Sequence, residues 1–357
     1  MSAALDALAR AAARWADPDH PARAAAVEAT LAAHGDAWTF EAVTFAVNQT
    51  MSVLTPDALA AWQAGRAAAS PVAVGVLHAG NIPMGEVQDL AAVLLAGHRY
   101  RGVVSSRAPH LLPAFLADVV RDTDGAIDAR VVSFEAMLDA AAHGGAVVAT
   151  GSDETREAVA ERCEAAGIPA DRRLLRGHRI SVAVVDGRET EAELEGLAED
   201  VLLHEGAGCR SVALVLAPPG LSPDPALAAI AAGRAVYPAP ASTAAGLRMA
   251  VSLARATGQP HAALDDGSLL VTRGEAEAQR AGHLRWSELA DVATAAAWVA
   301  AHADTLQLAA ARAGLHAALA DALVGTGVPI VALGDTQRPP LDWRPDGIDT
   351  LGWLATL

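Results

Sequence analysis

The sequence contains no lysine, and its basic side chains are outnumbered by acidic ones. All 26 basic residues among its 357 are arginine, against 42 acidic residues, and the formal net charge is -16. Proteins that bind the phosphate backbone of nucleic acids carry basic surfaces, so this balance argues against a nucleic-acid partner. A phosphate-bearing small ligand must instead be held by local backbone amides or by a few arginines.

Cysteines and long apolar runs are also scarce. Two cysteines, Cys163 and Cys209, are too few for a disulfide scaffold, and we expect both to be thiols. No apolar run reaches the roughly 18 residues needed to span a bilayer. Charges interrupt the N-terminal segment MSAALDALARAAARWADPDH, where a signal peptide requires an unbroken apolar stretch. We therefore expect a cytoplasmic protein without a membrane span.

The remaining composition is that of a globular protein. Hydrophobic residues make up 52% of the chain, charged residues 19% and aromatic residues only 4%. A length of 357 residues suggests about two domains and is sufficient for a large core.

The first half of the chain changes character at Pro71. Residues 1–70 are alanine-rich with helical periodicity, and Asp17, Pro21, Gly35 and Pro56 stand at expected helix ends. Short Val-rich runs then alternate with helical segments, and these strand candidates are PVAVGVLHAG, RYRGVVSS, ARVVSF and GGAVVATGS. Such alternation is typical of βαβ units on a parallel sheet.

The second half of the chain also alternates strand candidates with helical segments. RISVAVVDG, SVALVLAP, SLLVT and VPIVAL are strand candidates, and an acidic helix is expected from Glu189 to about Leu203. The alanine-rich stretch from about Leu289 to Leu323 predicts a long helical region. We expect two α/β lobes with a boundary near residues 186–190.

Cys209 is a candidate nucleophile in the segment GAGCRS. Gly206 and Gly208 allow the backbone to bend sharply, and Arg210 adds positive charge beside the thiol. Exposed backbone amides in such a turn lower a thiol pKa and stabilise an oxyanion. On these local features alone, a small buried residue is the more common interpretation of such a cysteine.

Two further segments follow strand candidates. Asn81 in HAGNIP stands where parallel sheets place ligands, although taken alone such a residue more commonly caps the next helix or fills the turn before Pro83. Gly151, Ser152 and Thr155 in GSDET form a strand-to-helix turn that admits a phosphate or ribose, or that simply caps the helix at Ser152 or Asp153. No GxGxxG, P-loop or GxSxG motif occurs, and the scattered histidines predict no metal site.

Taken in order, these segments resemble the aldehyde dehydrogenase superfamily and, within it, the acyl-CoA reductase family of the bacterial luminescence type. HAGNIP with the following GVVSSRAP is similar to the superfamily's oxyanion-asparagine and cofactor-binding stretch, and VVATGSDETRE to its glycine-serine turn. The block that ends in HEGAGCRSVALVLAP resembles the reductase segment with the nucleophilic cysteine. The tail GDTQRPPLDWRPDGIDTLGWL resembles the family's C-terminal segment. The resemblance covers roughly residues 71–215 and 328–357.

The resemblance implies an aldehyde dehydrogenase-like α/β fold, with two lobes that each contain a mainly parallel sheet. It implies a helical region at residues 1–70 packed on a Rossmann-like cofactor domain at 71–187. A catalytic domain at 188–330 would carry the nucleophile, and residues 331–357 would return to the core or to an assembly interface. A homo-oligomer is expected.

The implied reaction is the reduction of an acyl thioester, on CoA or an acyl carrier, to an aldehyde. Cys209 would form an acyl-enzyme, and Asn81 would stabilise the oxyanion. The cofactor would be NADP(H), or alternatively NAD(H), with CoA as co-substrate. Cofactor contacts would come from Gly151, Ser152 and Thr155.

Two departures from the family pattern matter. Val103 occupies the place of the usual cofactor-binding lysine, so those contacts would pass to Ser105, Ser106 or Arg107. The glutamate base of hydrolytic aldehyde dehydrogenases aligns near Arg176, where no carboxylate stands. This favours thioester exchange over hydrolysis, with His178, His204 or Glu205 as candidate acids or bases. Two alternatives stay open: oxidation of an aldehyde to acyl-CoA or acid, and a non-catalytic binding or assembly member of the fold.

Overall fold

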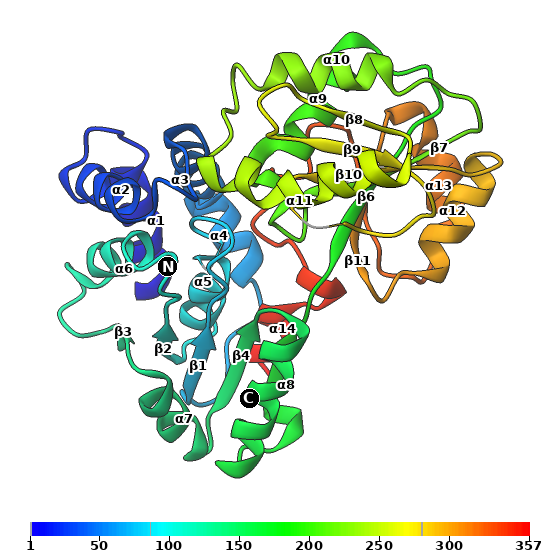
Figure 1. Ribbon diagram of the computed structural model, residues 1–357. Coiled ribbons are helices and arrows are strands. Elements are labelled where there is room, and N and C mark those ends of the chain that lie inside the picture. Colours follow the sequence, from blue (N-terminus) through cyan, green and yellow to red (C-terminus); the bar gives the residue numbers. More distant parts are fainter. Residues whose placement is uncertain (1, 86, 280) are drawn as a thin grey trace. The chain divides into compact units, whose positions relative to one another are not determined.

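The computed structural model describes residues 2–85, 87–279 and 281–357, which form two units (Figure 1). The first unit comprises Met1–His34, Val43–His178 and Pro340–Leu357. The second comprises Gly35–Ala42 and Arg179–Pro339. Each unit contains its own sheet.

Four helices precede the first strand: α1 (Ala3–Trp15), α2 (Pro21–His34), α3 (Phe40–Val53) and α4 (Pro56–Gln63). Pro21 and Pro56 begin their helices, where the missing N–H has no intrahelical partner in any case. The Thr55 side chain caps α4 by accepting from Ala58 N. These starts and ends agree with the breaks expected from the sequence.

The described part of the first unit contains a five-stranded parallel sheet in the order β3-β2-β1-β4-β5. Its strands are β1 (Ala73–Leu77), β2 (Arg99–Val103), β3 (Ala129–Val131), β4 (Ala146–Thr150) and β5 (Arg173–Arg176). The connecting helices are α5 (Val87–Leu95), α6 (Leu111–Val120), α7 (Phe134–Ala142) and α8 (Asp153–Ala165), and η1 (Ala170–Arg172) leads into β5. Strand order reverses between β1 and β4, which is the switch point where such sheets bind ligands.

The C-terminal segment belongs to this first unit and contains η4 (Pro345–Gly347) and α14 (Thr350–Leu354). Gln88 on α5 donates to the carbonyls of Leu341 and Trp343 at 2.9 and 2.6 Å. At the other end of the segment, His98 Nε2 lies 2.8 Å from the carbonyl of Leu354. The chain end is thus held against α5 and β2.

The described part of the second unit contains a seven-stranded sheet in the order β12-β11-β6-β7-β10-β9-β8. Its strands are β6 (Ile180–Val184), β7 (Val212–Ala217), β8 (His261–Ala263), β9 (Leu270–Arg273), β10 (His283–Glu288), β11 (Leu306–Ala311) and β12 (Ile330–Val331). The strand pairs described are parallel except for β8 with β9. The helices are α9 (Glu191–Leu202), α10 (Asp224–Gly233), α11 (Ala241–Thr257), α12 (Val292–Ala301) and α13 (His316–Leu323), with η2 (Leu203–Gly206) and η3 (Ala313–Leu315).

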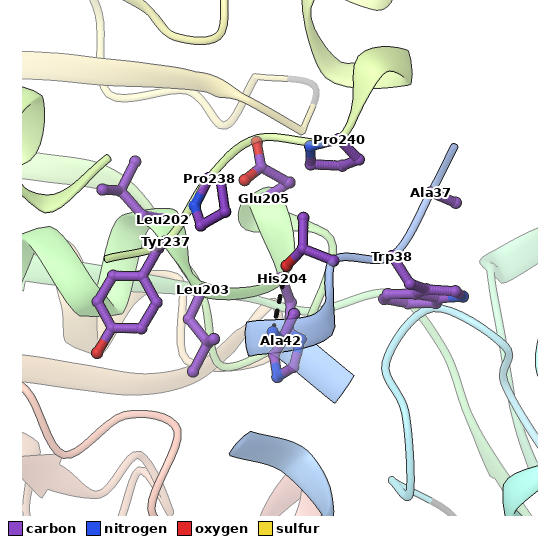
Figure 2. A pocket seen from close by; sticks show the side chains of 11 residues that line it. Ala37, Trp38, Ala42, Leu202, Leu203, His204, Glu205, Tyr237, Pro238 and Pro240 are labelled. Atoms are coloured by element: carbon purple, nitrogen blue, oxygen red, sulfur yellow. Dashed lines mark hydrogen bonds between the residues drawn. The ribbon is translucent and has the colours of Figure 1, made fainter. Parts of the chain in front are cut away.

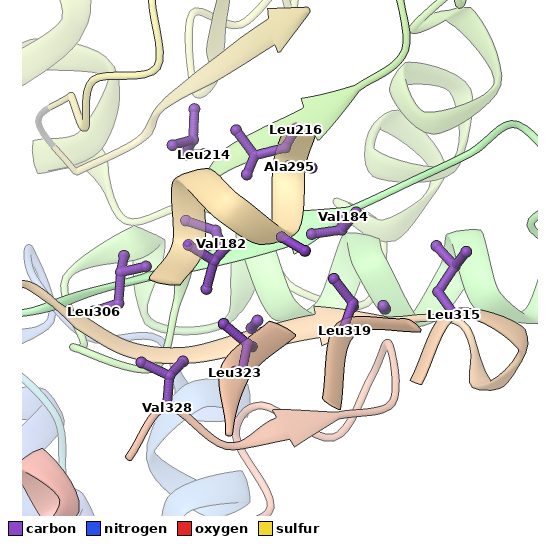
Figure 3. Close-up of a cluster of buried hydrophobic side chains, with 14 residues drawn as sticks. Val182, Val184, Leu214, Leu216, Ala295, Leu306, Leu315, Leu319, Leu323 and Val328 are labelled. Atoms are coloured by element: carbon purple, nitrogen blue, oxygen red, sulfur yellow. The ribbon is translucent and has the colours of Figure 1, made fainter. Parts of the chain in front are cut away.

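One core of this unit lies where α12 and α13 pack on β6, β7 and β11 (Figure 3). Val182, Leu214 and Leu319 are fully buried there. Central parallel strands are covered on both faces, which explains why RISVAVV and SVALVLA read as continuous apolar runs.

The two mainly parallel sheets confirm the expected α/β class, while four details differ. Residues 35–42, expected within the helical region packed on the cofactor domain, belong to the second unit. The helix expected across residues 289–323 is interrupted by β11, whose six residues are all buried between β6 and β12. The boundary expected at 187 lies between His178 and Arg179, because β6 pairs in the second sheet. The last segment, expected as one piece at 331–357, is divided between the units at Pro340.

Candidate active site

The loops that follow β1, β2 and β4 carry the residues expected to bind a cofactor. Because these strands are adjacent and parallel, their carboxyl ends meet at one edge of the first sheet. The residues at this edge are Asn81, Ser105, Ser106, Arg107, Gly151, Ser152 and Thr155. The structure therefore brings together all the predicted cofactor residues, in the same unit as Asn81.

The loops after β1 and β2 touch each other. A Cβ atom at Gly80 would overlap the Ser105 side chain, so only glycine permits this approach. Ser105 Oγ accepts a hydrogen bond from the Arg107 amide at 3.2 Å, and the side chains of Ser106 and Arg107 are exposed. Hydroxyls and a guanidinium thus stand at the sheet edge just beyond Val103.

The turn after β4 leads into the N-terminus of α8. Ser152 Oγ accepts from the Thr155 amide at 3.2 Å, so the capping role expected from the sequence is confirmed. The helix N-terminus favours an anion, whereas Asp153 in its first turn opposes one. Asp153 is engaged elsewhere, because its Oδ1 accepts from the His178 amide at 3.2 Å. A nicotinamide dinucleotide fits this edge, with the switch point, the helix N-terminus and the polar loop residues adjacent to one another.

Beneath this edge lies a buried polar cluster. Arg176 donates to both oxygens of Asp89 at 3.0 and 2.8 Å and to Thr350 Oγ at 2.6 Å. Arg176 therefore joins β5 to α5 and α14. His78 Nε2 lies 2.5 Å from the Tyr100 hydroxyl, and burial lowers the pKa of His78 to about 4. His78 is therefore uncharged at neutral pH.

Cys209 lies in a turn at the amino end of β7. It is partly exposed, and its carbonyl accepts from Ser181 Oγ of β6 at 2.8 Å. The Ser211 amide donates to Gly208 O at 2.9 Å and closes the turn. Cys163 is instead buried between α7, α8 and β4, where burial raises the pKa of its thiol. Within the described chain, neither cysteine forms a disulfide.

Arg210 follows Cys209 in the chain, and its guanidinium group is buried. Burial lowers the pKa of Arg210, and the interaction with Cys209 raises it.

A loop from the end of the second sheet supports this turn. Gln337 Nε2 lies 3.4 Å from Ser211 Oγ and 3.4 Å from Thr336 Oγ. Asp200 of α9 is fully buried and accepts from Gly334 N, Thr336 N and Thr336 Oγ at 2.7, 3.2 and 2.7 Å. Burial raises the pKa of Asp200 to about 7 against the effect of these donors.

Three residues in succession before the turn adopt left-handed backbone conformations. The φ angles of His204, Glu205 and Gly206 are 61°, 56° and 72°. Non-glycine residues in this region cost about 1–3 kcal/mol each, so the surroundings must hold them. Arg234 donates to both carboxylate oxygens of Glu205 at 2.5 and 3.0 Å, and Gly282 N donates to Glu205 O at 2.8 Å.

The protonation of the two candidate acid–base residues differs. Burial, reinforced by Arg210, lowers the pKa of His204 to about 3, so its imidazole is neutral. Burial raises the pKa of Glu205, while Arg234 opposes the rise. Neither residue stands as an unpaired charge beside the thiol.

A small pocket, partly open to solvent, lies beside this bend (Figure 2). Its lining comes from three segments of the second unit: Ala37, Trp38, Thr39 and Ala42; Leu202, Leu203, His204 and Glu205; and Tyr237, Pro238 and Pro240. Most of this lining is aliphatic, aromatic or proline.

Cys209, His204 and Glu205 are thus close in one unit, whereas Asn81 lies in the other, and its pairing with Cys209 stays a prediction. Sequence reasoning missed Arg234, Asp200, Gln337 and Trp38. None of them stands in a motif, and their importance depends on long-range contacts.

The part of the chain that the structure describes contains no group of three or more His, Cys, Asp or Glu residues that could hold a metal ion. Among the described helices, none is both long and apolar enough to cross a membrane.

Comparison with solved structures identifies the fold. The chain is similar to a NAD-dependent benzaldehyde dehydrogenase from Corynebacterium glutamicum, with 17% identity and a TM-score of 0.66 over 93% of this chain and 81% of that one. It is also similar to a succinic semialdehyde dehydrogenase from Streptococcus pyogenes in complex with NADP+, with 14% identity and a TM-score of 0.73 over 99% and 89% of the two chains. The aldehyde dehydrogenase-like fold is confirmed, and these identities are too low to carry a substrate across.

The sequence itself places the chain in a family. No curated protein matches it. Residues 1–221, more than half of the chain, match the family described as acyl-CoA reductase (LuxC). The chain belongs to the acyl-CoA reductase (LuxC) family of oxidoreductases.

Proposed function

We propose that the protein reduces an acyl thioester, on CoA or an acyl carrier, to the aldehyde by way of an acyl group on Cys209. The observation that carries this proposal is that Cys209 is a partly exposed residue in a braced turn, directly followed by Arg210. A thiolate is the reactive form of cysteine, and a neighbouring cation stabilises it.

The first half-reaction is an exchange of thioesters. The Cys209 sulfur attacks the acyl carbon, and the carbonyl oxygen becomes an oxyanion held by the Cys209 amide and the Asn81 side chain. The carbon–sulfur bond to the carrier then breaks, and the carrier leaves as a thiolate while Cys209 keeps the acyl group. Because a thiolate both attacks and departs, no base is needed to take a proton from water.

A reaction that needs no such base agrees with the ion pairs that engage Arg176 and Glu205. Arg176 is committed to Asp89, and Glu205 is paired with Arg234. A residue that activates water is needed for hydrolysis of the acyl-enzyme, so these pairs favour thioester exchange over release of a free acid.

The cofactor in this proposal is NADP(H), with CoA as the leaving carrier. Ser105, Ser106 and Arg107 would hold the adenosine side, and Gly151, Ser152 and Thr155 the phosphate and ribose at the start of α8. A reduced nicotinamide, when bound, would supply the hydride that converts the acyl group to an aldehyde and releases Cys209 as the thiolate.

Mass spectrometry of the intact protein, mixed with an acyl-CoA but no cofactor, tests the first half-reaction. We expect a mass increase equal to the acyl group, lost in Cys209→Ala and kept in the matched Cys163→Ala variant. Addition of NADPH should then release aldehyde. No adduct on the wild-type protein with any acyl-CoA would overturn the proposal.

The reverse direction and the non-catalytic alternative are separated by two assays. An enzyme that oxidises aldehydes reduces NADP+ with aldehyde, and CoA dependence shows whether acyl-CoA or acid is made. A binding or assembly protein gives neither activity and leaves Cys209 unreactive. Sedimentation measures whether the protein is the homo-oligomer that we expect.

A further inference from the structure

Ser181 carries a buried hydroxyl in an otherwise apolar strand. It lies on β6, whose other residues are isoleucine, valine and alanine, in the interior of the seven-stranded sheet. The side chain is fully buried, and a buried hydroxyl is costly unless it forms a hydrogen bond. Ser181 Oγ donates that bond to the carbonyl oxygen of Cys209 at 2.8 Å. The proposed nucleophile is therefore tied to the interior of the sheet.

The strand pairing is irregular on both sides of Ser181. The pairing of β6 with β11 shifts between Ile180 and Ser181, and its pairing with β7 shifts between Ser181 and Val182. Irregularities of this kind redirect side chains and are frequent beside active sites. The two shifts flank the one residue of β6 whose hydroxyl reaches the Cys209 turn.

A second hydrogen bond fixes the other side of Cys209. The Ser211 amide donates to the Gly208 carbonyl at 2.9 Å. That carbonyl and the Cys209 N–H belong to one planar trans peptide group, in which they point in opposite directions. The Ser211 bond therefore sets the direction of the Cys209 N–H, which is the group proposed to stabilise the oxyanion.

Together the two hydrogen bonds determine the backbone conformation of Cys209. The peptide group before its Cα is held by Ser211, and the peptide group after it is held by Ser181. Because both groups are planar, fixing them leaves little freedom in φ and ψ. The direction of the Cα–Cβ bond follows, and the sulfur keeps only its rotation about χ1.

We propose that Ser181 is a positioning residue for the reaction: it holds the Cys209 carbonyl so that the sulfur and the Cys209 N–H keep the orientation that attack on an acyl carbon requires. This inference rests on the function proposed above. Attack joins the sulfur to the carbon while charge develops on the oxygen, so both groups must be aligned at once. Alkylation of the thiolate has no oxyanion and needs only the sulfur.

The test compares these two reactions in the full-length protein without cofactor. Intact mass follows acylation of Cys209 by the straight-chain acyl-CoA that reacts fastest with the wild type, and alkylation of Cys209 by iodoacetamide. Ser181→Ala should slow acylation at least about tenfold, since misplacement of reacting groups by about 1 Å costs up to about a hundredfold. Alkylation should change by less than about twofold, because a displaced but accessible thiolate still reacts with a small reagent.

Two larger side chains separate the hydrogen bond from packing. Ser181→Thr keeps the hydroxyl, whereas Ser181→Val has nearly the same shape and lacks it. The threonine variant should acylate at least about fivefold faster than the valine variant, since a buried hydrogen bond is typically worth a factor of about this size. This comparison holds even where the alanine variant folds poorly.

Ser287 provides the matched control on another strand of the same sheet. It lies on β10, is 1% exposed, and its Oγ donates to the Gly274 carbonyl at 2.9 Å. Ser287 pairs with Leu216 towards the carboxyl end of β7, whereas Cys209 precedes the amino end of that strand. Ser287→Ala removes a bond of the same kind and should keep the wild-type ratio of acylation to alkylation.

The outcomes distinguish this inference from the function on which it rests. Equal acylation by the threonine and valine variants, or the same loss in Ser287→Ala as in Ser181→Ala, would overturn the positioning role and leave the Cys209 acyl-enzyme in place. Equal slowing of acylation and alkylation in Ser181→Ala would also overturn it, because it would show a general disturbance of the turn. Absence of any adduct on the wild-type protein would instead refute the proposed function.

Discussion

Arg234 holds both carboxylate oxygens of Glu205 while Glu205 stands in a left-handed backbone conformation. The side chains are 9% and 14% exposed, so the pair is largely removed from water. Arg234 also donates to the carbonyl of Ser268 at 2.8 Å. One arginine thus connects the bend before Cys209 to the start of β9.

Removal of this arginine should be strongly destabilising. Arg234→Met leaves Glu205 buried without a partner, and loss of one member of a buried pair costs about 3–5 kcal/mol. The decrease in the free energy of unfolding caused by Arg234→Met should be greater at pH 8 than at pH 5. A carboxyl with a raised pKa contributes stability below its ordinary pKa and loses it as the pH rises through the raised value.

Urea denaturation of Arg234→Met at both pH values measures this effect. The double variant Arg234→Met/Glu205→Gln is the control, because it removes the unpaired carboxylate and should recover part of the stability. A single variant as stable as the wild type at pH 8 would show that the pair has no role in holding the bend.

Asp200 predicts a pH dependence of folding. Its pKa is raised to about 7 by burial, above the ordinary value of 3.8. Its contribution to stability is therefore present below about pH 4 and is lost as the pH rises through 7, by up to about 4 kcal/mol. Asp200→Asn cannot titrate, so its free energy of unfolding should vary less than that of the wild type between pH 4.5 and 8. Parallel curves for the two proteins would contradict this.

The same residue shows where sequence reasoning stops. The acidic helix Glu189–Leu203 was predictable from its pattern and corresponds to α9, capped by Thr190. Nothing in that pattern separates Asp200 from its acidic neighbours. Asp200 differs from those neighbours because residues 334 and 336, more than 130 positions later in the chain, donate hydrogen bonds to its carboxylate.

Strand β11 shows that long-range contacts also decide secondary structure that the local sequence does not predict. LQLAAA predicts helix because alanine has the highest helix propensity. In the structure, pairing with β6 and β12 and burial of all six residues override that preference. Likewise, β6 was recognised as a strand, but its membership in the second sheet depends on its partners β7 and β11 rather than on its own residues.

The site was more predictable where a local signal existed. Glycines beside Cys209, and strand-to-helix turns at Asn81 and Gly151, are visible in the sequence and lie at the expected sheet ends. Trp38 and Arg234 carry no such signal, because a pocket wall and a long-range ion pair require distant segments to come together.

Arg210 should control the reactivity of Cys209. Arg210→Met removes the neighbouring cation, and a change of one pKa unit in a thiol alters the thiolate fraction at neutral pH about tenfold. Alkylation of Cys209 by iodoacetamide at pH 7 should slow by this factor, and its pH profile should move to higher pH. Arg210→Lys should restore much of the rate.

Cys163 supplies the internal reference for that experiment. It is buried in the first unit, so it should react only after unfolding, and its labelling reports whether a variant has lost structure. Equal Cys209 alkylation in Arg210→Met and the wild type, with Cys163 protected in both, would remove Arg210 from the proposed mechanism.

Two helical glycines make a matched pair that tests the support of the turn. A Cβ atom at Gly196 in α9 would lie 2.7 Å from the Leu333 carbonyl oxygen and 2.9 Å from Gly334 N, both backbone atoms. A Cβ atom at Gly246 in α11 would meet nothing within 4 Å. Alanine is favoured over glycine in helices by about 1 kcal/mol, so Gly246→Ala should raise the melting temperature.

Gly196→Ala should lower the melting temperature despite the same propensity gain, because it pushes α9 away from residues 333 and 334, at a cost of about 1–3 kcal/mol. The displaced segment carries Thr336 and Gln337, which contact Asp200 and Ser211. Acylation of Cys209 should therefore slow in Gly196→Ala and not in Gly246→Ala, measured well below both melting temperatures. Normal acylation in a destabilised Gly196→Ala protein would mean that the segment stabilises the fold without positioning the Cys209 turn.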